Sequence, residues 1–549
     1  MKQTYLNLIF TNALYKLGVE SNYNLIFDIP KNEEHGDMSC NIAMQLAKEL
    51  KKAPIQIANN ILENLEFDNN IVSEVSVAAP GFINIRYSNH FHFETLKSAF
   101  EAGNDLGRQE IGKNIKVNVE YVSANPTGLL HLGHGRNACL GDTIANLYDW
   151  LGYDVTREYY FNNAGNQMNN LTLSIYSRYR QTLGNEEFPF PENGYFGEYI
   201  KLIANELVEK YNDKLIDDNE ENKQLIKKYG EEWCFNTIKN TLHKMKIVQD
   251  VFYNEDSLYT DGKIQELLED FKQKGLSYEK DGAVWLKLSE MGLSEDRVIV
   301  KSSGEPTYRL PDIAYHKEKF KRGFDILVDV FGADHIATVP DVVAGVKHLG
   351  YDESKMNVVI HQFVTLTENG VQVKMSKRTG KSYTLDELLE EVGADVVRFF
   401  FIMRSCHTHL EFDLALAKEQ SDKNPVFYLQ YAHARCCSVI RNLTSSEFNS
   451  NIDINSLNSL TFNEHEVKLI KSMSQFESYI ELAATKNEPY ILVEYLKDFA
   501  SNFHNFYHNC RVMDAEELVK NSRYVILETS RRILKNGLTI LGITSPEKM

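Results

Sequence analysis

The chain has 549 residues, of which 43% are hydrophobic and 25% charged, which indicates a folded protein of several domains and excludes a disordered one. Its net charge of −18 excludes a broadly basic surface and confines any nucleic-acid contact to a local face. We find neither a signal peptide nor an apolar run long enough to cross a membrane, so we expect a cytoplasmic protein with no membrane partner.

The first ninety residues predict a small α+β domain. Residues 37–65 have helical periodicity, and Pro54 is suited to the first turn of a second helix. Residues 71–87 change to the spacing of two strands joined by a Pro-Gly turn. We therefore place an N-terminal domain at 1–90 and expect a helical connector over 91–112.

A β-loop-α unit typical of nucleotide-binding sheets follows. Residues 116–123 form a short β-rich run, and a long amphipathic helix is expected to end near Leu151. Further strands are predicted at 155–160, 298–301, 326–331 and 356–363. Because helical stretches separate them, we predict an α/β fold with a mainly parallel sheet over 91–385, interrupted by a largely helical insertion at about 168–290.

The last third of the chain predicts a helical bundle. From residue 386 onward the pattern is almost entirely helical, so we assign an all-α domain to 386–549. The seven cysteines include no Cys-x-x-Cys pair, which predicts reduced thiols and no structural zinc.

His131-Leu-Gly-His134 stands where the predicted loop passes into a helix. At a helix N-terminus both imidazoles can face an anionic ligand that the helix dipole also favours. Gly133 lets a flat ring approach the backbone, and Gly128 frees the preceding loop. Such a pair can equally belong to a core or a metal site, although no third ligand of suitable spacing lies nearby.

A second run, Lys-Met-Ser-Lys-Arg at 374–378, is flanked by Gly370 and Gly380. This arrangement is typical of a flap that closes on phosphates, and a solvated basic hairpin is the alternative. The sequence contains neither a P-loop nor a Gly-x-Gly-x-x-Gly fingerprint after the first strand, which excludes a P-loop enzyme and argues against a dinucleotide cofactor.

In this order the two runs resemble the signature motifs of class I aminoacyl-tRNA synthetases. Longer strings narrow the resemblance to the arginyl-tRNA synthetase family; they lie at 123–134, 306–316, 424–435, 503–512 and 534–543. The resemblance implies a Rossmann-like catalytic domain, an N-terminal domain that touches the tRNA elbow and a helical bundle that binds the anticodon. It also implies the activity of an arginine-tRNA ligase, and we expect a monomer.

By this resemblance, ATP and L-arginine give arginyl-adenylate, and the arginyl group then passes to tRNA(Arg) for protein synthesis. Magnesium accompanies ATP, and no zinc or other protein-bound metal is expected. The catalytic positions implied are His131, His134, Lys374 and Lys377. The ATP-binding positions implied are Gly128, His131, Gly133, His134, Lys374, Met375, Ser376 and Lys377.

Selection of arginine requires an acidic group, because a guanidinium presents a planar fork of donors that matches a carboxylate. The positions that the resemblance implies are Ser123, Asn125, Tyr308 and Asp312. The spacing of the last two puts them on one face of a helix, although Pro311 makes a turn equally plausible. Asp154 is a weaker second acidic candidate.

In the predicted bundle, aromatic and polar side chains mix at Tyr431, His433, Arg435, Phe503, Phe506 and Tyr507. Aromatic residues at helical spacing are more often core than RNA platforms, and we expect that of most of these six.

Two positions depart from the family pattern, since Asn163 and Ser303 stand where relatives commonly have aspartate. A class I synthetase for another amino acid and a catalytically silent tRNA-binding paralogue remain the alternatives. A silent paralogue usually loses the motifs that this chain retains. Relatives typically need tRNA before they activate arginine, and we expect the same here.

Overall fold

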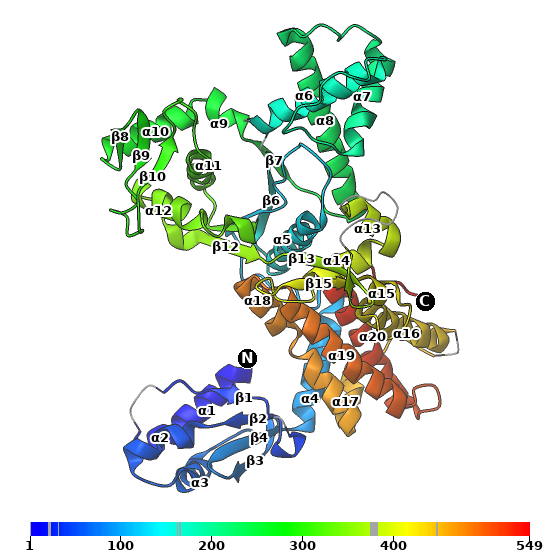
Figure 1. Cartoon of the computed structure of the whole chain (residues 1–549). Coiled ribbons are helices and arrows are strands. Elements are labelled where there is room, and N and C mark those ends of the chain that lie inside the picture. Colours follow the sequence, from blue (N-terminus) through cyan, green and yellow to red (C-terminus); the bar gives the residue numbers. More distant parts are fainter. Residues whose placement is uncertain are drawn as a thin grey trace.

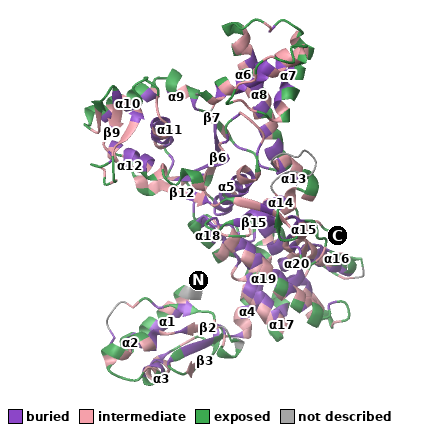
Figure 2. Ribbon diagram, viewed as in Figure 1, coloured by how far each residue is buried: buried purple, intermediate pink, exposed green. Residues whose placement is uncertain are grey.

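The computed structural model describes residues 2–19, 23–30, 32–161, 163, 166–373, 383–445 and 448–549. Figure 1 shows an N-terminal unit, a central sheet that carries two outlying lobes, and a C-terminal bundle of helices beside the sheet. Buried residues run through the centre of each of these parts (Figure 2). Within the described residues no helix is both long enough and apolar enough to cross a bilayer.

The N-terminal unit is an antiparallel sheet of order β1-β2-β4-β3 covered by helices. Its elements are α1 (Lys2–Lys16), β1 (Phe27–Asp28), β2 (Met38–Cys40), α2 (Ile42–Leu50), α3 (Pro54–Asn64), β3 (Val72–Ala78) and β4 (Phe82–Tyr87). The two strands predicted at 71–87 are confirmed, and Pro54 opens α3 as expected. The helical pattern over 37–65 missed β2, because three residues are too few to display the period of a strand.

The central sheet is parallel and has the order β12-β11-β5-β6-β7. The connector helix α4 (Asn89–Glu101) leads to it, and its elements are β5 (Lys116–Glu120), α5 (Leu132–Trp150), β6 (Asp154–Phe161), β7 (Val251–Asn254), β11 (Ile326–Gly332) and β12 (Met356–His361). After β5 the chain adds β6 and then β7 on one side of it, and later adds β11 and then β12 on the other side. A crevice therefore opens at the carboxyl ends of β5 and β11, where such sheets bind ligands.

Two outlying lobes interrupt this sheet. The first contains α6 (Asn166–Thr182), α7 (Glu198–Tyr211) and α8 (Glu220–Lys244), which share a hydrophobic core of their own. The second contains α9 (Asp256–Thr260), α10 (Lys263–Gln273), β8 (Ser277–Lys280), β9 (Ala283–Leu286), β10 (Arg297–Val300), α11 (Arg309–Lys321) and α12 (Val339–Leu349).

One expectation for this region was wrong. The strand predicted at 298–301 exists as β10, but it pairs antiparallel with β9 and lies outside the parallel sheet. The insertion expected to be largely helical contains the helices α6 to α10 and also the short strands β7, β8 and β9. A four-residue apolar run does not reveal whether it belongs to a parallel sheet or to a hairpin, because both require the same side chains.

A small sheet joins the parallel-sheet region to the bundle. It consists of β13 (Val364–Glu368), β14 (Val371–Gln372) and β15 (Leu410–Asp413), and β15 runs parallel to β13. The prediction of an all-α region from residue 386 onward is therefore wrong at β15. Its four residues are too few to override the helical pattern on either side.

The bundle and the parallel sheet share one hydrophobic core. The helices are α13 (Leu385–Val392), α14 (Ala394–Ile402), α15 (Leu414–Lys418), α16 (Pro425–Thr444), α17 (Glu464–Met473), α18 (Phe476–Lys486), α19 (Tyr490–Asn509) and α20 (Glu517–Ile540).

Buried Arg398 joins three segments of the chain. Its guanidinium contacts a carboxylate oxygen of Asp142 at 2.5 Å and donates to the carbonyl oxygens of Met245 and Leu541. Gly542 has φ +71°, and a Cβ there would lie 1.9 Å from that guanidinium.

Candidate active site

A cavity of about 620 Å³ lies at the carboxyl ends of β5, β11 and β12. Its walls come from the loop after β5, the first turns of α5, the start of α11 and the segment between β11 and α12. Seven predicted site residues line it; they are Ser123, Asn125, His131, Gly133, His134, Tyr308 and Asp312.

The two histidines hold each other at the N-terminus of α5. The Nδ1 atom of His131 accepts from the backbone N–H groups of Gly133 and His134, at 3.1 and 3.4 Å, and Nδ1 of His134 accepts from the N–H of His131 at 3.3 Å. The two rings stack with centroids 3.6 Å apart. A neutral imidazole that accepts through Nδ1 carries its proton on Nε2, so each ring offers one N–H donor.

Burial keeps both rings neutral. It lowers the pKa of His131, and it lowers that of His134 to about 3 with the help of the neighbouring imidazoles. The Nε2–H donors of the two rings and the dipole of α5 favour an anion at the same place. The positive character of this wall therefore comes from oriented donors rather than from charged histidines.

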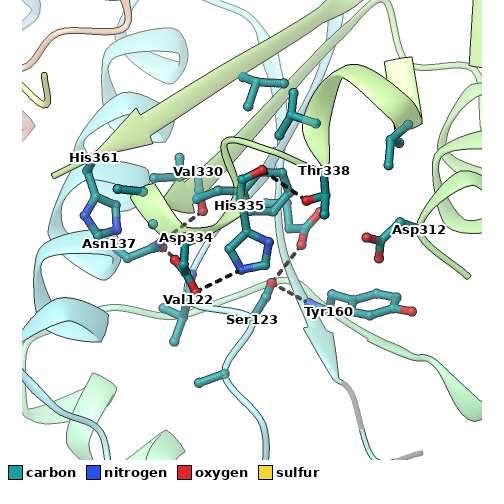
Figure 3. A pocket seen from close by; sticks show the side chains of 18 of the residues that line it. Val122, Ser123, Asn137, Tyr160, Asp312, Val330, Asp334, His335, Thr338 and His361 are labelled. Atoms are coloured by element: carbon teal, nitrogen blue, oxygen red, sulfur yellow. Dashed lines mark hydrogen bonds and ion pairs between the residues drawn. The ribbon is translucent and has the colours of Figure 1, made fainter. Parts of the chain in front are cut away.

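The loop after β5 has a strained backbone that α5 holds in place. Val122 and Ser123 have φ values of +69° and +40°, a region that residues other than glycine rarely enter, and β-branched residues such as valine least of all. The amide of Asn137 accepts from the N–H of Val122 at 2.6 Å and donates to the carbonyl of Val330 at 2.7 Å (Figure 3). Ser123 accepts from the N–H of Tyr160 through its hydroxyl, at 3.0 Å.

The opposite wall is acidic. Buried Glu120 accepts from the hydroxyl of Ser123 at 2.9 Å and from the ammonium of Lys319 at 2.6 Å. Asp312 projects from the first turn of α11 on the far side of the cavity (Figure 3). Burial raises its pKa to about 7, and the charges of Glu120 and Glu255 oppose the lowering effect of His316.

A buried network joins the carboxylate of Glu120 to the backbone carbonyl of Asp312. His316 lies 3.1 Å from Asp329 through Nε2 and 2.7 Å from the carbonyl of Asp312 through Nδ1, and Lys319 binds both Asp329 and Glu120. Burial alone would lower the pKa of His316, but Asp329 raises it above its ordinary value. The residues of α11 in this network are spaced as one helical face, so the helix aligns the acidic wall as a unit.

Tyr308, Gly128 and Asp154 lie at the mouth of the cavity or away from it. Tyr308 stands at the mouth and is 80% exposed. Gly128 is absent from the lining residues, and a Cβ there would lie 3.3 Å from the hydroxyl of Tyr199. The suggestion that Asp154 is a second acidic residue of the arginine site was wrong. Asp154 is the first residue of β6, level with Lys116 of β5, and therefore lies at the amino end of the sheet, opposite the cavity.

Lys374, Met375, Ser376, Lys377 and Arg378 lie outside the described residues. Beyond them, Thr384 pairs with His131, and the N–H of Leu385 donates to the carbonyl of Leu130 at 2.9 Å. The chain that follows the basic run therefore returns to the start of α5.

Comparisons with known proteins identify the family. Three family models match: "Arginyl tRNA synthetase N terminal domain" at 4–87, "tRNA synthetases class I (R), catalytic domain" at 95–398, and "DALR anticodon binding domain" at 429–549. An arginine-tRNA ligase of Desulfotalea psychrophila is 47% identical, over 95% of this chain and 94% of its own. The chain belongs to the arginyl-tRNA synthetase family.

Other members agree. An arginine-tRNA ligase of Salinibacter ruber is 44% identical, over 99% of this chain and 100% of its own. The arginyl-tRNA synthetase structure of Thermus thermophilus has a TM-score of 0.76 over 100% of both chains, and at 22% identity it supports the fold. The expected architecture, an α/β core between an α+β domain and a helical bundle, is confirmed.

One departure from the family pattern has a local explanation. The amide of Asn163 donates to a carboxylate oxygen of Glu231 at 3.0 Å, and an aspartate at 163 would face that carboxylate with a like charge. Ser303 is exposed and does not line the cavity.

Burial separates the six aromatic and polar residues singled out in the bundle. Phe503, Phe506 and His433 are buried, as expected of core positions. The guanidinium of Arg435 instead lies 4.6 Å from the ring centres of both Tyr431 and Tyr507.

Sequence reasoning missed Glu120, Asn137, Lys319 and Asp329. The carboxylates had a signal: charged residues inside otherwise apolar strands are rare unless paired. Asn137 had none beyond its place one turn after His134.

Proposed function

We propose that this chain is an arginine-tRNA ligase that uses the cavity to form arginyl-adenylate from ATP and L-arginine and then transfers the arginyl group to tRNA(Arg). One observation carries the assignment of the site. A single cavity has two carboxylates on one wall and a helix N-terminus with two imidazole N–H donors on the other. Arginine and a triphosphate need these two opposite environments side by side.

The acidic wall suits a guanidinium. Asp312 and Glu120 approach from different elements, so a planar fork of donors can reach both. Ser123 and Asn125 lie where the chain turns after β5 and are assigned to the ammonium and carboxylate ends of the amino acid. Tyr308, at the mouth, is assigned to cover the bound side chain. Lysine fits this wall less well, because a single ammonium cannot form two parallel pairs.

The opposite wall suits ATP. His131 and His134 donate through Nε2 to phosphate oxygens, and Gly133 leaves room beside the backbone for the nucleotide. A Cβ at Gly133 would lie 3.0 Å from the ring of His131, so a larger residue would displace that ring. Gly128, Met375 and Ser376 keep their assignment to the ATP site, and Lys374 and Lys377 are assigned to the triphosphate as pyrophosphate leaves. The return of the chain to His131 after the basic run supports this placement.

No enzymic nucleophile is required, because the carboxylate of arginine itself attacks the α-phosphorus and pyrophosphate leaves. Catalysis is then positioning and charge stabilisation. The acidic residues that line the cavity are Glu120, Asp312 and Asp334. The first two face the proposed guanidinium site, so a magnesium ion would be held mainly by ATP phosphates and water.

The bundle supplies the proposed RNA contact. Arg435 between Tyr431 and Tyr507 offers a cation and two aromatic faces on one surface, which suits stacking with unpaired bases. This local basic site agrees with the net charge of −18. We also assign a monomer, because one chain carries both the proposed reaction cavity and the proposed RNA-binding surface. We assign this monomer to the cytoplasm.

Aminoacylation of total tRNA with labelled arginine tests the proposal. We expect activity with arginine alone among the amino acids, and a loss of about 100-fold or more in His134→Ala and Lys377→Ala. Both variants should keep the circular dichroism spectrum of the parent. Charging with another amino acid would favour a different specificity. Equal activity in the parent and both variants would refute the site, and no charging at all would favour a silent paralogue.

A further inference from the structure

Three potential metal ligands that do not line the cavity meet where the parallel-sheet region joins the bundle. Cys406 and His407 follow α14, and Glu488 lies between α18 and α19. One carboxylate oxygen of Glu488 is 3.4 Å from Sγ of Cys406 and 3.6 Å from Nε2 of His407. All three ligand atoms lie within 4.8 Å of one another.

These separations match a tetrahedral metal centre. Zinc binds sulfur at about 2.3 Å and nitrogen or oxygen at about 2.0 to 2.2 Å, so neighbouring ligands of one ion lie roughly 3.3 to 3.8 Å apart. The distances from the Glu488 oxygen to Sγ of Cys406 and to Nε2 of His407 both fall in that range. A thiolate, an imidazole and a carboxylate together are a donor set typical of zinc, whereas magnesium and calcium prefer oxygen alone.

The ligands are held in place and reachable. Glu488 accepts from the hydroxyl of Ser405 at 2.7 Å and, through its other oxygen, from the N–H of Cys406 at 3.2 Å. Such outer contacts orient a carboxylate ligand. Cys406 and Glu488 are buried, but the side chain of His407 is 74% exposed, so an ion can enter from its side.

We propose that Cys406, His407 and Glu488 bind one Zn²⁺ ion, with water as the fourth ligand. The thiolate and the carboxylate balance the charge of the ion. Buried Arg136 is the opposing factor, since its cation lies within electrostatic reach of Cys406 and Glu488. It is fixed by the carbonyls of Gln362, Ser405 and Thr408, at 2.8 to 3.0 Å, and therefore limits the affinity without blocking the site.

A bound ion would act as a clip. It would join the loop after α14 to the start of α19, which belong to different regions of the chain. Arg136 already holds the same loop from α5, two residues after His134. The sequence could not reveal this site, because Glu488 is far from the other two ligands in the chain and Cys-x-x-Cys spacing is absent.

The test is titration of the reduced, chelator-treated full-length chain with Zn²⁺ by calorimetry. A parallel titration with Cd²⁺ monitors the ultraviolet thiolate-to-metal charge-transfer band. We expect one ion per chain and a rise in melting temperature when the ion is bound. Cys406→Ser, His407→Ala and Glu488→Gln should each weaken binding at least about tenfold, and Cys406→Ser should abolish the cadmium band.

Matched controls separate ligation from general damage. Cys437→Ser replaces another buried cysteine, His409→Ala a histidine bonded to Thr365, and Glu494→Gln a glutamate paired with Lys497. These three should bind zinc like the parent. His407→Ala is decisive if Glu488→Gln disturbs folding, because His407 is exposed. Absence of stoichiometric binding, or unchanged affinity in His407→Ala and Cys406→Ser, would overturn the proposal.

Discussion

Arginine binding should release a proton from Asp312. Burial raises the pKa of this carboxyl to about 7 in the free cavity, whereas a bound guanidinium favours the ionised form. Only the ionised fraction binds well, so the apparent dissociation constant is the intrinsic one divided by that fraction. With a pKa of about 7, this factor is about 11 at pH 6 and about 1.1 at pH 8. Arginine should therefore bind about tenfold more weakly at pH 6.

Calorimetric titration with arginine from pH 6 to 8, with tRNA and a non-hydrolysable ATP analogue present, measures this effect. Repeating it at pH 7 in buffers of different ionisation enthalpy should reveal uptake by buffer of about half a proton per arginine bound. Asp312→Asn should bind arginine about 10- to 100-fold more weakly, as expected for loss of a charged hydrogen bond, and should lose the pH dependence. His134 and His361 have pKa values lowered to about 3 and about 4, so neither titrates in this window. An affinity that is flat from pH 6 to 8, or an unchanged slope in Asp312→Asn, would refute the reasoning.

Three further predictions concern the stability of the fold. Asp312→Asn should raise the melting temperature of the free chain, and more at pH 8 than at pH 5. The reason is that a carboxyl with a raised pKa in the folded chain destabilises the fold increasingly as pH rises from its pKa in the unfolded chain to about 7. An equal gain at both pH values would contradict this. Arg398→Leu leaves Asp142 buried without its cation and should reduce the free energy of unfolding in urea by about 3 to 5 kcal/mol, so a loss below about 1 kcal/mol would show that the pair is dispensable. Gly542→Ala places a Cβ against the same guanidinium at a positive φ and should cost more than about 1 kcal/mol in the same assay, whereas Gly184→Ala, where the φ is also positive but no atom lies within 4 Å, should cost less.

The strength of each sequence signal explains which elements were predictable. The β5-α5 unit was predictable because a short β-rich run, a turn and a helix-length segment follow one another. The periods alone were weak signals, since β5 is buried at four successive residues and α5 is buried around nearly its whole circumference. β10 and β15 were misjudged because four residues cannot report their sheet or direction. Parallel pairing depends on contacts between segments far apart in the chain, which a local pattern does not contain.

The candidate site divides in the same way. Residues beside the histidine motif and at the start of α11 were found because they belong to long, specific strings. Lys319 was missed because it looks locally like an ordinary helix residue. The charge of Asp329 inside an apolar strand indicates a partner, but only the fold shows that the partner is Lys319. Asp154 was misplaced because a carboxylate at one end of a strand cannot be assigned to an edge of the sheet until the direction of the strand is known.

The shared core of the parallel sheet and the bundle has a consequence for how the molecule comes apart. Residues from Phe93 to Ile543 contribute to one continuous apolar cluster, whereas the cluster of the N-terminal unit ends at Ile85. Reaction and anticodon reading are separate tasks, yet the regions proposed for them should melt in one cooperative transition, with the N-terminal unit free to melt on its own. A fragment ending at residue 385 would expose its remaining part of that cluster to water and should aggregate. The boundary between the regions proposed for the two tasks is therefore not a boundary between independently stable units.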